Sequence, residues 1–92
     1  MNLERLLERF CRYVRVDTTA VPNAGRYPSS AGQLELGELI ADELEELGLA
    51  DVEQDAHGLV WATLPSNARH PIDAIALCAH FDTSPETTGK NV

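Results

Sequence analysis

Residues 72–85, with the sequence IDAIALCAHFDTSP, decide how the chain is interpreted. They begin with a continuous apolar run, residues 74–79, and end on side chains that are capable of chemistry. A short continuous apolar run is typical of a strand buried on both faces of a sheet. In α/β proteins, catalytic and binding groups lie just beyond the carboxyl ends of such strands. Pro85 cannot continue a central strand, so the strand is expected to end before it. The chemically capable side chains at this strand end predict an enzyme-like site at residues 80–84.

Two amphipathic helices are predicted upstream, because apolar residues recur at spacings of three and four. The first stripe consists of Leu3, Leu6, Leu7, Phe10, Tyr13 and Val14, and the second of Leu36, Leu39, Ile40, Leu44 and Leu47. Ser30 and Gln33 match a capping box at the start of the second helix, and Gly48 suits the position just past its end. The arginines of the first helix and the carboxylates of the second, Glu43 included, are assigned to solvated faces.

Residues 17–29 contain prolines and a glycine and are predicted to form an irregular loop. Its Asp17-Thr18-Thr19 motif indicates either a local turn held by side-chain hydrogen bonds or a position near a site. Residues 52–65 are predicted to form a hairpin that turns at residues 55–58. The turn residue His57 is interpreted as a polar surface residue. The order helix, loop, helix, hairpin, linker, buried strand is an α/β pattern.

Composition narrows the class of protein. The net charge of −8 argues against a nucleic-acid partner, and no apolar segment approaches the roughly 20 residues that span a bilayer. The charged N-terminal sequence lacks the apolar core of a signal peptide, so a cytoplasmic location is expected. Cys11 and Cys78 form no CxxC pair and are predicted to be buried free thiols.

His80 and Asp82 are the candidate site residues. Residues two apart in a strand point to the same side, so both side chains are expected to project together, with Phe81 facing the other way. His80 would bind a metal ion and Asp82 would orient its ring. Two alternatives stay open: a structural pair at a strand end, and a Ser84 nucleophile with His80 as its base. The second is weaker, because Ser84 lacks a strained strand-to-helix turn.

Residues 80–85, HFDTSP, and residues 89–92, GKNV, together resemble the metal-binding strand end of peptidase T. This family consists of tripeptide aminopeptidases among the di-zinc exopeptidases related to aminoacylase and the glutamate carboxypeptidases. Residues 6–10, 16–18, 43–49 and 57–58 are also similar to the opening of that family, so the resemblance covers the chain collinearly.

The resemblance implies that residues 1–92 are the N-terminal part of a catalytic domain with a mixed sheet. His80 matches the first zinc ligand, and Asp82 matches the catalytic-site aspartate that supports it. The complete enzyme would hold two zinc ions and cleave small peptides. The general-base glutamate, the bridging aspartate, the other ligands and the dimerisation domain belong downstream. At most one zinc ligand is present here, the substrate-binding residues are unknown, and the chain alone is expected to be inactive.

Other functions remain open at this stage. A related di-zinc carboxypeptidase or N-acyl amino acid deacylase would share the His-x-Asp motif, and a truncated, non-catalytic remnant could persist by oligomerising. Because only two helices are available to cover an apolar strand, exposed apolar surface is expected. The chain is therefore expected to self-associate or to pack against the remainder of the enzyme.

Overall fold

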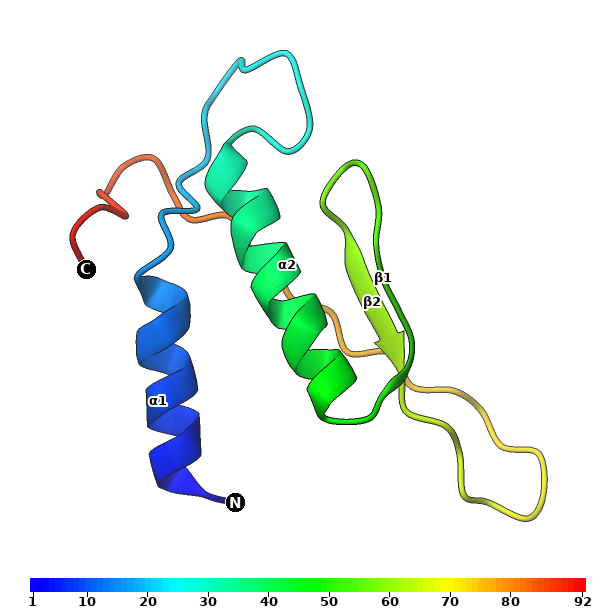
Figure 1. Cartoon of the computed structure of the whole chain (residues 1–92). Coiled ribbons are helices and arrows are strands. Elements are labelled where there is room, and N and C mark those ends of the chain that lie inside the picture. Colours follow the sequence, from blue (N-terminus) through cyan, green and yellow to red (C-terminus); the bar gives the residue numbers. More distant parts are fainter.

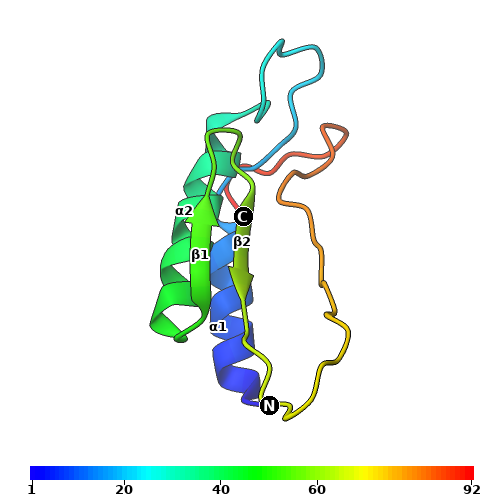
Figure 2. The same ribbon diagram turned by 90° about the vertical axis from the view of Figure 1, so that its right-hand side faces the viewer.

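The computed structural model describes all residues, 1–92. Its elements are α1 (Leu3–Val14), α2 (Ala31–Glu46), β1 (Ala50–Gln54) and β2 (Val60–Thr63). The helices run in opposite directions, and α2 lies between α1 and the hairpin (Figure 1). Figure 2 shows the hairpin lying over α2, with the chain after β2 arching away. The predicted mixed α/β class, two helices and hairpin are confirmed.

Helix α1 begins directly after its N-cap residue, Asn2. The side-chain oxygen of Asn2 accepts a hydrogen bond from Arg5 N at 3.1 Å, which satisfies one of the free N–H groups of the first turn. The helix buries none of its residues, and most of its apolar stripe faces solvent, with Leu7 63% and Phe10 60% exposed, while Tyr13 and Val14 at its end are half-buried. The expected amphipathic helix is therefore present, but its apolar face has no covering element.

The polar face of α1 makes the contact with α2. Arg9 Nε lies 3.4 Å from Glu43 Oε2, and Arg12 and the Tyr13 hydroxyl also contact the Glu43 carboxylate. Glu43 is only 8% exposed. The assignment of Glu43 to a solvated face was therefore wrong. A buried carboxylate is tolerated here because two guanidinium groups and a phenol hydroxyl surround it.

Helix α2 begins at the predicted residue but without the predicted capping box. Ser30 has the extended backbone of a cap residue, yet its hydroxyl makes no capping hydrogen bond. The Gln33 side chain donates instead to Thr18 O at 3.3 Å and to Ser29 Oγ at 3.1 Å. Because the Gln33 side chain binds the preceding loop, it does not form the hydrogen bond to Ser30 that a capping box requires.

The end of α2 follows its sequence signal. Gly48 has φ = +85°, a conformation that L side chains rarely adopt. Gly48 N donates to Glu45 O at 2.9 Å, and Leu49 N donates to Leu44 O at 3.1 Å. This pair of bonds is a Schellman motif, which satisfies the last carbonyl groups and directs the chain into β1.

The hairpin is antiparallel and turns where the sequence predicts. Asp55 Oδ1 accepts hydrogen bonds from His57 N at 2.9 Å and Leu59 N at 3.0 Å, and Gly58 takes the left-handed conformation with φ = +85°. The exposed position of His57 agrees with its interpretation as a surface residue.

Helix α2 packs against both strands of the hairpin. Leu36, 7% exposed, is the one buried hydrophobic residue of the chain, and it lies on the face of α2 that carries Glu43, seven residues further on. Gly37 lets the layers approach closely, because a Cβ there would lie 3.2 Å from a Val60 methyl group and 3.3 Å from the Phe81 ring. Neither helix is long and apolar enough to cross a membrane.

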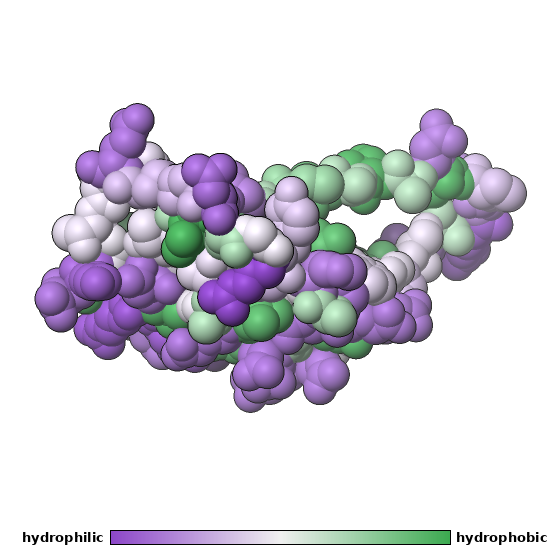
Figure 3. All heavy atoms as spheres, turned by 90° about the horizontal axis from the view of Figure 1, so that it is seen from above, coloured by the Kyte–Doolittle hydropathy of each residue, from purple (hydrophilic) through white to green (hydrophobic).

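The predicted buried strand is not formed. Residues 72–80 have no strand partner, and Ile75 is 89% and Leu77 96% exposed. A space-filling view shows hydrophobic residues along an arch of chain that stands clear of the body of the molecule (Figure 3). A strand buried on both faces needs neighbouring strands in its sheet and elements that cover each face of that sheet. Here α2 packs against the hairpin and does not cover residues 72–80. Both cysteines are free, as predicted, but neither is buried: Cys11 is partly exposed and Cys78 is exposed.

Candidate functional site

His80 and Asp82 contact one another, as their spacing predicted, although the segment that carries them is not a strand. His80 Nδ1 lies 2.7 Å from the backbone oxygen of Asp82 and 3.0 Å from Asp82 Oδ1. A backbone carbonyl can only accept a hydrogen bond, so Nδ1 must carry the ring proton. The lone pair of a neutral imidazole then lies on Nε2. This tautomer is the one in which Nε2 can bind an electrophile such as a metal ion.

The pair lies at the surface, where a ligand could reach it. The His80 side chain is 84% exposed and that of Asp82 52%. The neighbouring Phe81 faces the protein instead, with its ring against α2 at Gly37. The predicted division between Phe81 and its two polar neighbours is therefore seen in the structure.

On its other side, Asp82 is followed by a residue that pairs with the loop before α2. Thr83 and Thr19 form a parallel bridge, in which Ala20 N donates to Thr83 O at 2.9 Å and Thr83 N donates to Thr18 O at 3.3 Å. The sequence alone did not place this loop relative to His80 and Asp82, which lie some sixty residues further along the chain. The structure brings the two segments together.

The local turn expected in this loop is also present. Asp17 Oδ1 accepts hydrogen bonds from Thr19 N at 3.1 Å and from Thr19 Oγ1 at 2.5 Å. These bonds favour the ionised carboxylate, so the Thr19 hydroxyl and backbone N–H hold the pKa of Asp17 below its usual value. Both interpretations of the motif, a hydrogen-bonded turn and a position beside the candidate site, therefore apply.

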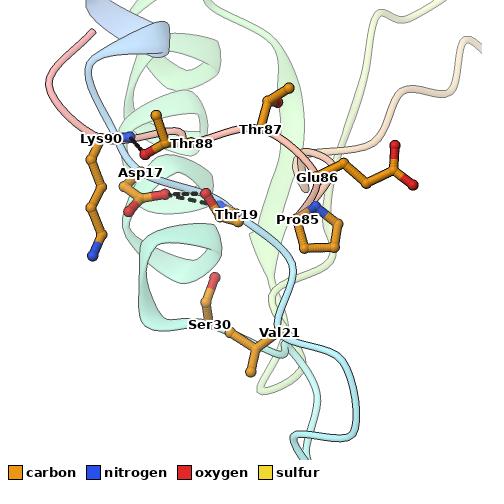
Figure 4. A pocket seen from close by; sticks show the side chains of 9 residues that line it. All are labelled: Asp17, Thr19, Val21, Ser30, Pro85, Glu86, Thr87, Thr88 and Lys90. Atoms are coloured by element: carbon orange, nitrogen blue, oxygen red, sulfur yellow. Dashed lines mark hydrogen bonds between the residues drawn. The ribbon is translucent and has the colours of Figure 1, made fainter.

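A polar pocket of about 440 Å³ lies against this turn. Figure 4 shows Asp17 and Thr19 on one wall and residues 85–90 on another, with Lys90 beside Asp17. Ser30 contributes a hydroxyl that is buried without a hydrogen-bond partner. His80 and Asp82 do not line this pocket, so it is a separate feature from the exposed imidazole.

The residues present fit one position of a metal site. No three His, Cys, Asp or Glu side chains lie close enough together to hold a metal ion. The donor chemistry at His80 suits a single ligand, with Asp82 as the carboxylate that fixes its tautomer. The Ser84 alternative is not assembled: Ser84 Oγ accepts a hydrogen bond from Glu86 N at 3.2 Å and makes none with His80.

The chain is similar over its whole length to curated bacterial proteins. Peptidase T of Bacillus cereus (strain Q1) is 45% identical over 93 aligned residues, which cover 100% of this chain and 23% of that protein. Peptidase T of Bacillus thuringiensis (strain Al Hakam) and of Bacillus anthracis are each 45% identical over 89 residues, covering 97% of this chain and 22% of the relative. No protein-family model matches the chain.

The chain thus spans less than a quarter of the length of these relatives. The resemblance to peptidase T that the sequence motifs indicated is confirmed, and the covered share is consistent with an N-terminal segment.

Proposed function

We propose that residues 1–92 form the N-terminal part of the catalytic domain of a zinc-dependent tripeptide aminopeptidase. The observation that carries the proposal is the contact of His80 Nδ1 with the backbone oxygen and the carboxylate of Asp82. It leaves Nε2 of an exposed imidazole with a free lone pair. The 45% identity to peptidase T supports the class of reaction.

In this proposal His80 binds one zinc ion through Nε2, and Asp82 holds the ring and raises the basicity of the imidazole. Zinc in such a site supplies a Lewis acid for the scissile carbonyl and a water of lowered pKa. The remaining metal ligands and the general base would come from other parts of a longer protein. Because His80 and Asp82 cannot by themselves supply them, we propose that residues 1–92 alone are inactive.

A chimera tests these roles. In it, this chain replaces the matching segment of Bacillus cereus peptidase T, and hydrolysis of a tripeptide is measured with added zinc. His80→Ala should lower kcat/KM about 100-fold or more, because a metal ligand is lost. Asp82→Ala should lower it about 10- to 100-fold, the usual effect of removing the partner of a metal-bound histidine. The matched control is His57→Ala, which removes an exposed histidine from the hairpin turn and should leave kcat/KM unchanged.

The possible outcomes test the role of His80, the inactivity of the chain and the class of substrate. A folded chimera in which His80→Ala retains full activity would rule out His80 as a ligand. Tripeptide hydrolysis by the purified 92-residue chain would rule out its inactivity. In a full-length parent of this chain, hydrolysis of N-acyl amino acids in preference to tripeptides would favour the related deacylases over the tripeptidases.

A further inference from the structure

Residues 65–92 are joined to the rest of the molecule by hydrogen bonds at a single residue, Thr83. The hydrogen bonds from residues 65–92 to the rest of the molecule are the two at Thr83, to Thr18 O and from Ala20 N. The side-chain hydrogen bonds of this segment all stay within it. Because Thr83 directly follows Asp82, the position of Asp82 depends on the backbone conformation of residues 18–20.

That backbone is shaped by Asp17. Its Oδ1 accepts from Thr19 N at 3.1 Å and from Thr19 Oγ1 at 2.5 Å, which closes a turn at residues 17–19. The turn leaves Thr18 O and Ala20 N available to Thr83. The lowered pKa of Asp17, caused first by the Thr19 hydroxyl, agrees with an ionised carboxylate in this turn.

Neighbouring groups hold the turn in place. Thr18 is 3% exposed, and its carbonyl oxygen also accepts from Gln33 Nε2 at 3.3 Å. A Cβ on Gly89 would lie 2.7 Å from both Asp17 Oδ1 and Thr19 Oγ1, so the backbone of Gly89 lies directly on the hydrogen-bonded pair. Figure 4 shows this pair with its two hydrogen bonds. The turn is therefore packed against α2 and the C-terminal segment.

A second attachment lies on the other side of Asp82. The ring of Phe81 packs where Gly37 leaves room beside Val60. Asp82 is thus fixed between an apolar contact at Phe81 and a backbone bridge at Thr83. Of these two contacts, only the bridge fixes the orientation of the backbone at Asp82, because hydrogen bonds are directional and apolar contacts are not.

We propose that Asp17 and Thr19 are positioning residues for the His80–Asp82 pair. They act through Thr83, which sets the backbone of Asp82, whose carbonyl and carboxylate oxygens in turn select the Nδ1–H tautomer of His80. This inference rests on the proposed function for its purpose, but the contacts that carry it are independent of any metal ion.

The tautomer of His80 can be measured in the full 92-residue chain by ¹⁵N–¹H NMR of the imidazole nitrogens at alkaline pH. The unsubstituted chain should show mainly the Nδ1–H form. Asp17→Ala should reduce the ratio of Nδ1–H to Nε2–H about tenfold, the scale of one lost hydrogen bond. Asp17→Asn should restore it, because the amide oxygen accepts the same two bonds. Thr19→Val, which removes only the hydroxyl, should have a smaller effect than Asp17→Ala.

Asp55→Ala is the matched control. Asp55 also accepts two local hydrogen bonds through one carboxylate oxygen, from His57 N and Leu59 N, but it lies in the hairpin turn. Its removal should leave the His80 tautomer ratio unchanged. Circular dichroism reports whether each variant folds, and Thr19→Val decides the matter if Asp17→Ala unfolds.

The outcomes separate this inference from the proposed function. A normal Nδ1–H excess that survives both Asp17→Ala and Thr19→Val would overturn the positioning role and leave the roles of His80 and Asp82 intact. Absence of the Nδ1–H form from the unsubstituted chain would overturn the contact on which both proposals rest. An equal loss in Asp55→Ala would show a general loosening of the fold and would also overturn the positioning role.

Discussion

Helix α2 and residues 72–79 are two regions in which the sequence concentrates apolar residues for burial, yet the structure buries a residue of the first and exposes the second. Leu36 of α2 is 7% exposed, whereas Leu77 is 96% exposed. The hairpin covers one face of α2, and no element covers the arch formed by residues 72–79. An apolar pattern therefore predicts which side chains gain free energy from burial, but burial itself depends on a partner surface.

The largest expected effect tests this contrast with the same substitution in each region. Leu36→Ala should lower the free energy of unfolding by about 2–5 kcal/mol, because it leaves a cavity at a buried position of α2. Leu77→Ala should change it by less than about 0.5 kcal/mol, because the side chain is already in water. Urea denaturation followed by Trp61 fluorescence measures both. Equal losses in the two variants would mean that the arch is packed in solution.

The elements that the sequence predicted correctly depend on local signals. Gly48 ends α2 through contacts within five residues, and Asp55 with Gly58 makes the hairpin turn through its own backbone. The errors concern residues whose partners are distant in sequence. Glu43 was assigned to solvent because nothing within α2 indicates that Arg9 and Arg12 of another helix would surround it.

The same distinction applies to the candidate site. The contact of His80 with Asp82 follows from a spacing of two residues, and the sequence predicted it. The bridge between Thr19 and Thr83 joins residues 64 positions apart, and no local pattern specifies it. The Asp17-Thr18-Thr19 motif did signal a hydrogen-bonded turn, which was the one available clue.

The second prediction concerns what the uncovered arch does in solution. Because Ile75 and Leu77 are both nearly fully exposed, the purified chain should associate as its concentration rises. Leu77→Asp should weaken this association about tenfold or more, since burying an unpaired carboxylate at a contact is unfavourable. Analytical ultracentrifugation measures it, with Glu86→Gln as a surface control. A concentration-independent monomer in the unsubstituted chain would contradict the prediction.

Helix α1 differs from both regions, because polar rather than apolar side-chain groups attach it to α2. Tyr13 donates its hydroxyl hydrogen to Glu43, beside the arginines that contact the same carboxylate. Burial, the hydrogen bond and the negative charge of Glu43 together raise the pKa of Tyr13 to about 12, each by disfavouring the phenolate.

The smallest expected effect follows from that shift in pKa. In the unfolded chain Tyr13 should titrate near 10.0 and in the folded chain near 12, so the folded state binds more protons between these values. The stabilisation from the neutral phenol is complete below pH 10 and is lost as the pH rises through 12. Solvent screening keeps the effect modest, because the phenol is only partly buried.

Tyr13→Phe isolates this contribution. Urea denaturation at several pH values between 9 and 12 should show the unsubstituted chain losing more stability with rising pH than the variant does. The other ionisable groups are the same in both chains, so their contributions cancel in the difference. Parallel curves would mean that the Tyr13 hydroxyl is free in solution. In that case the attachment of α1 would rest on Arg9 and Arg12 alone, and the polar face would hold the helix less firmly than the structure indicates.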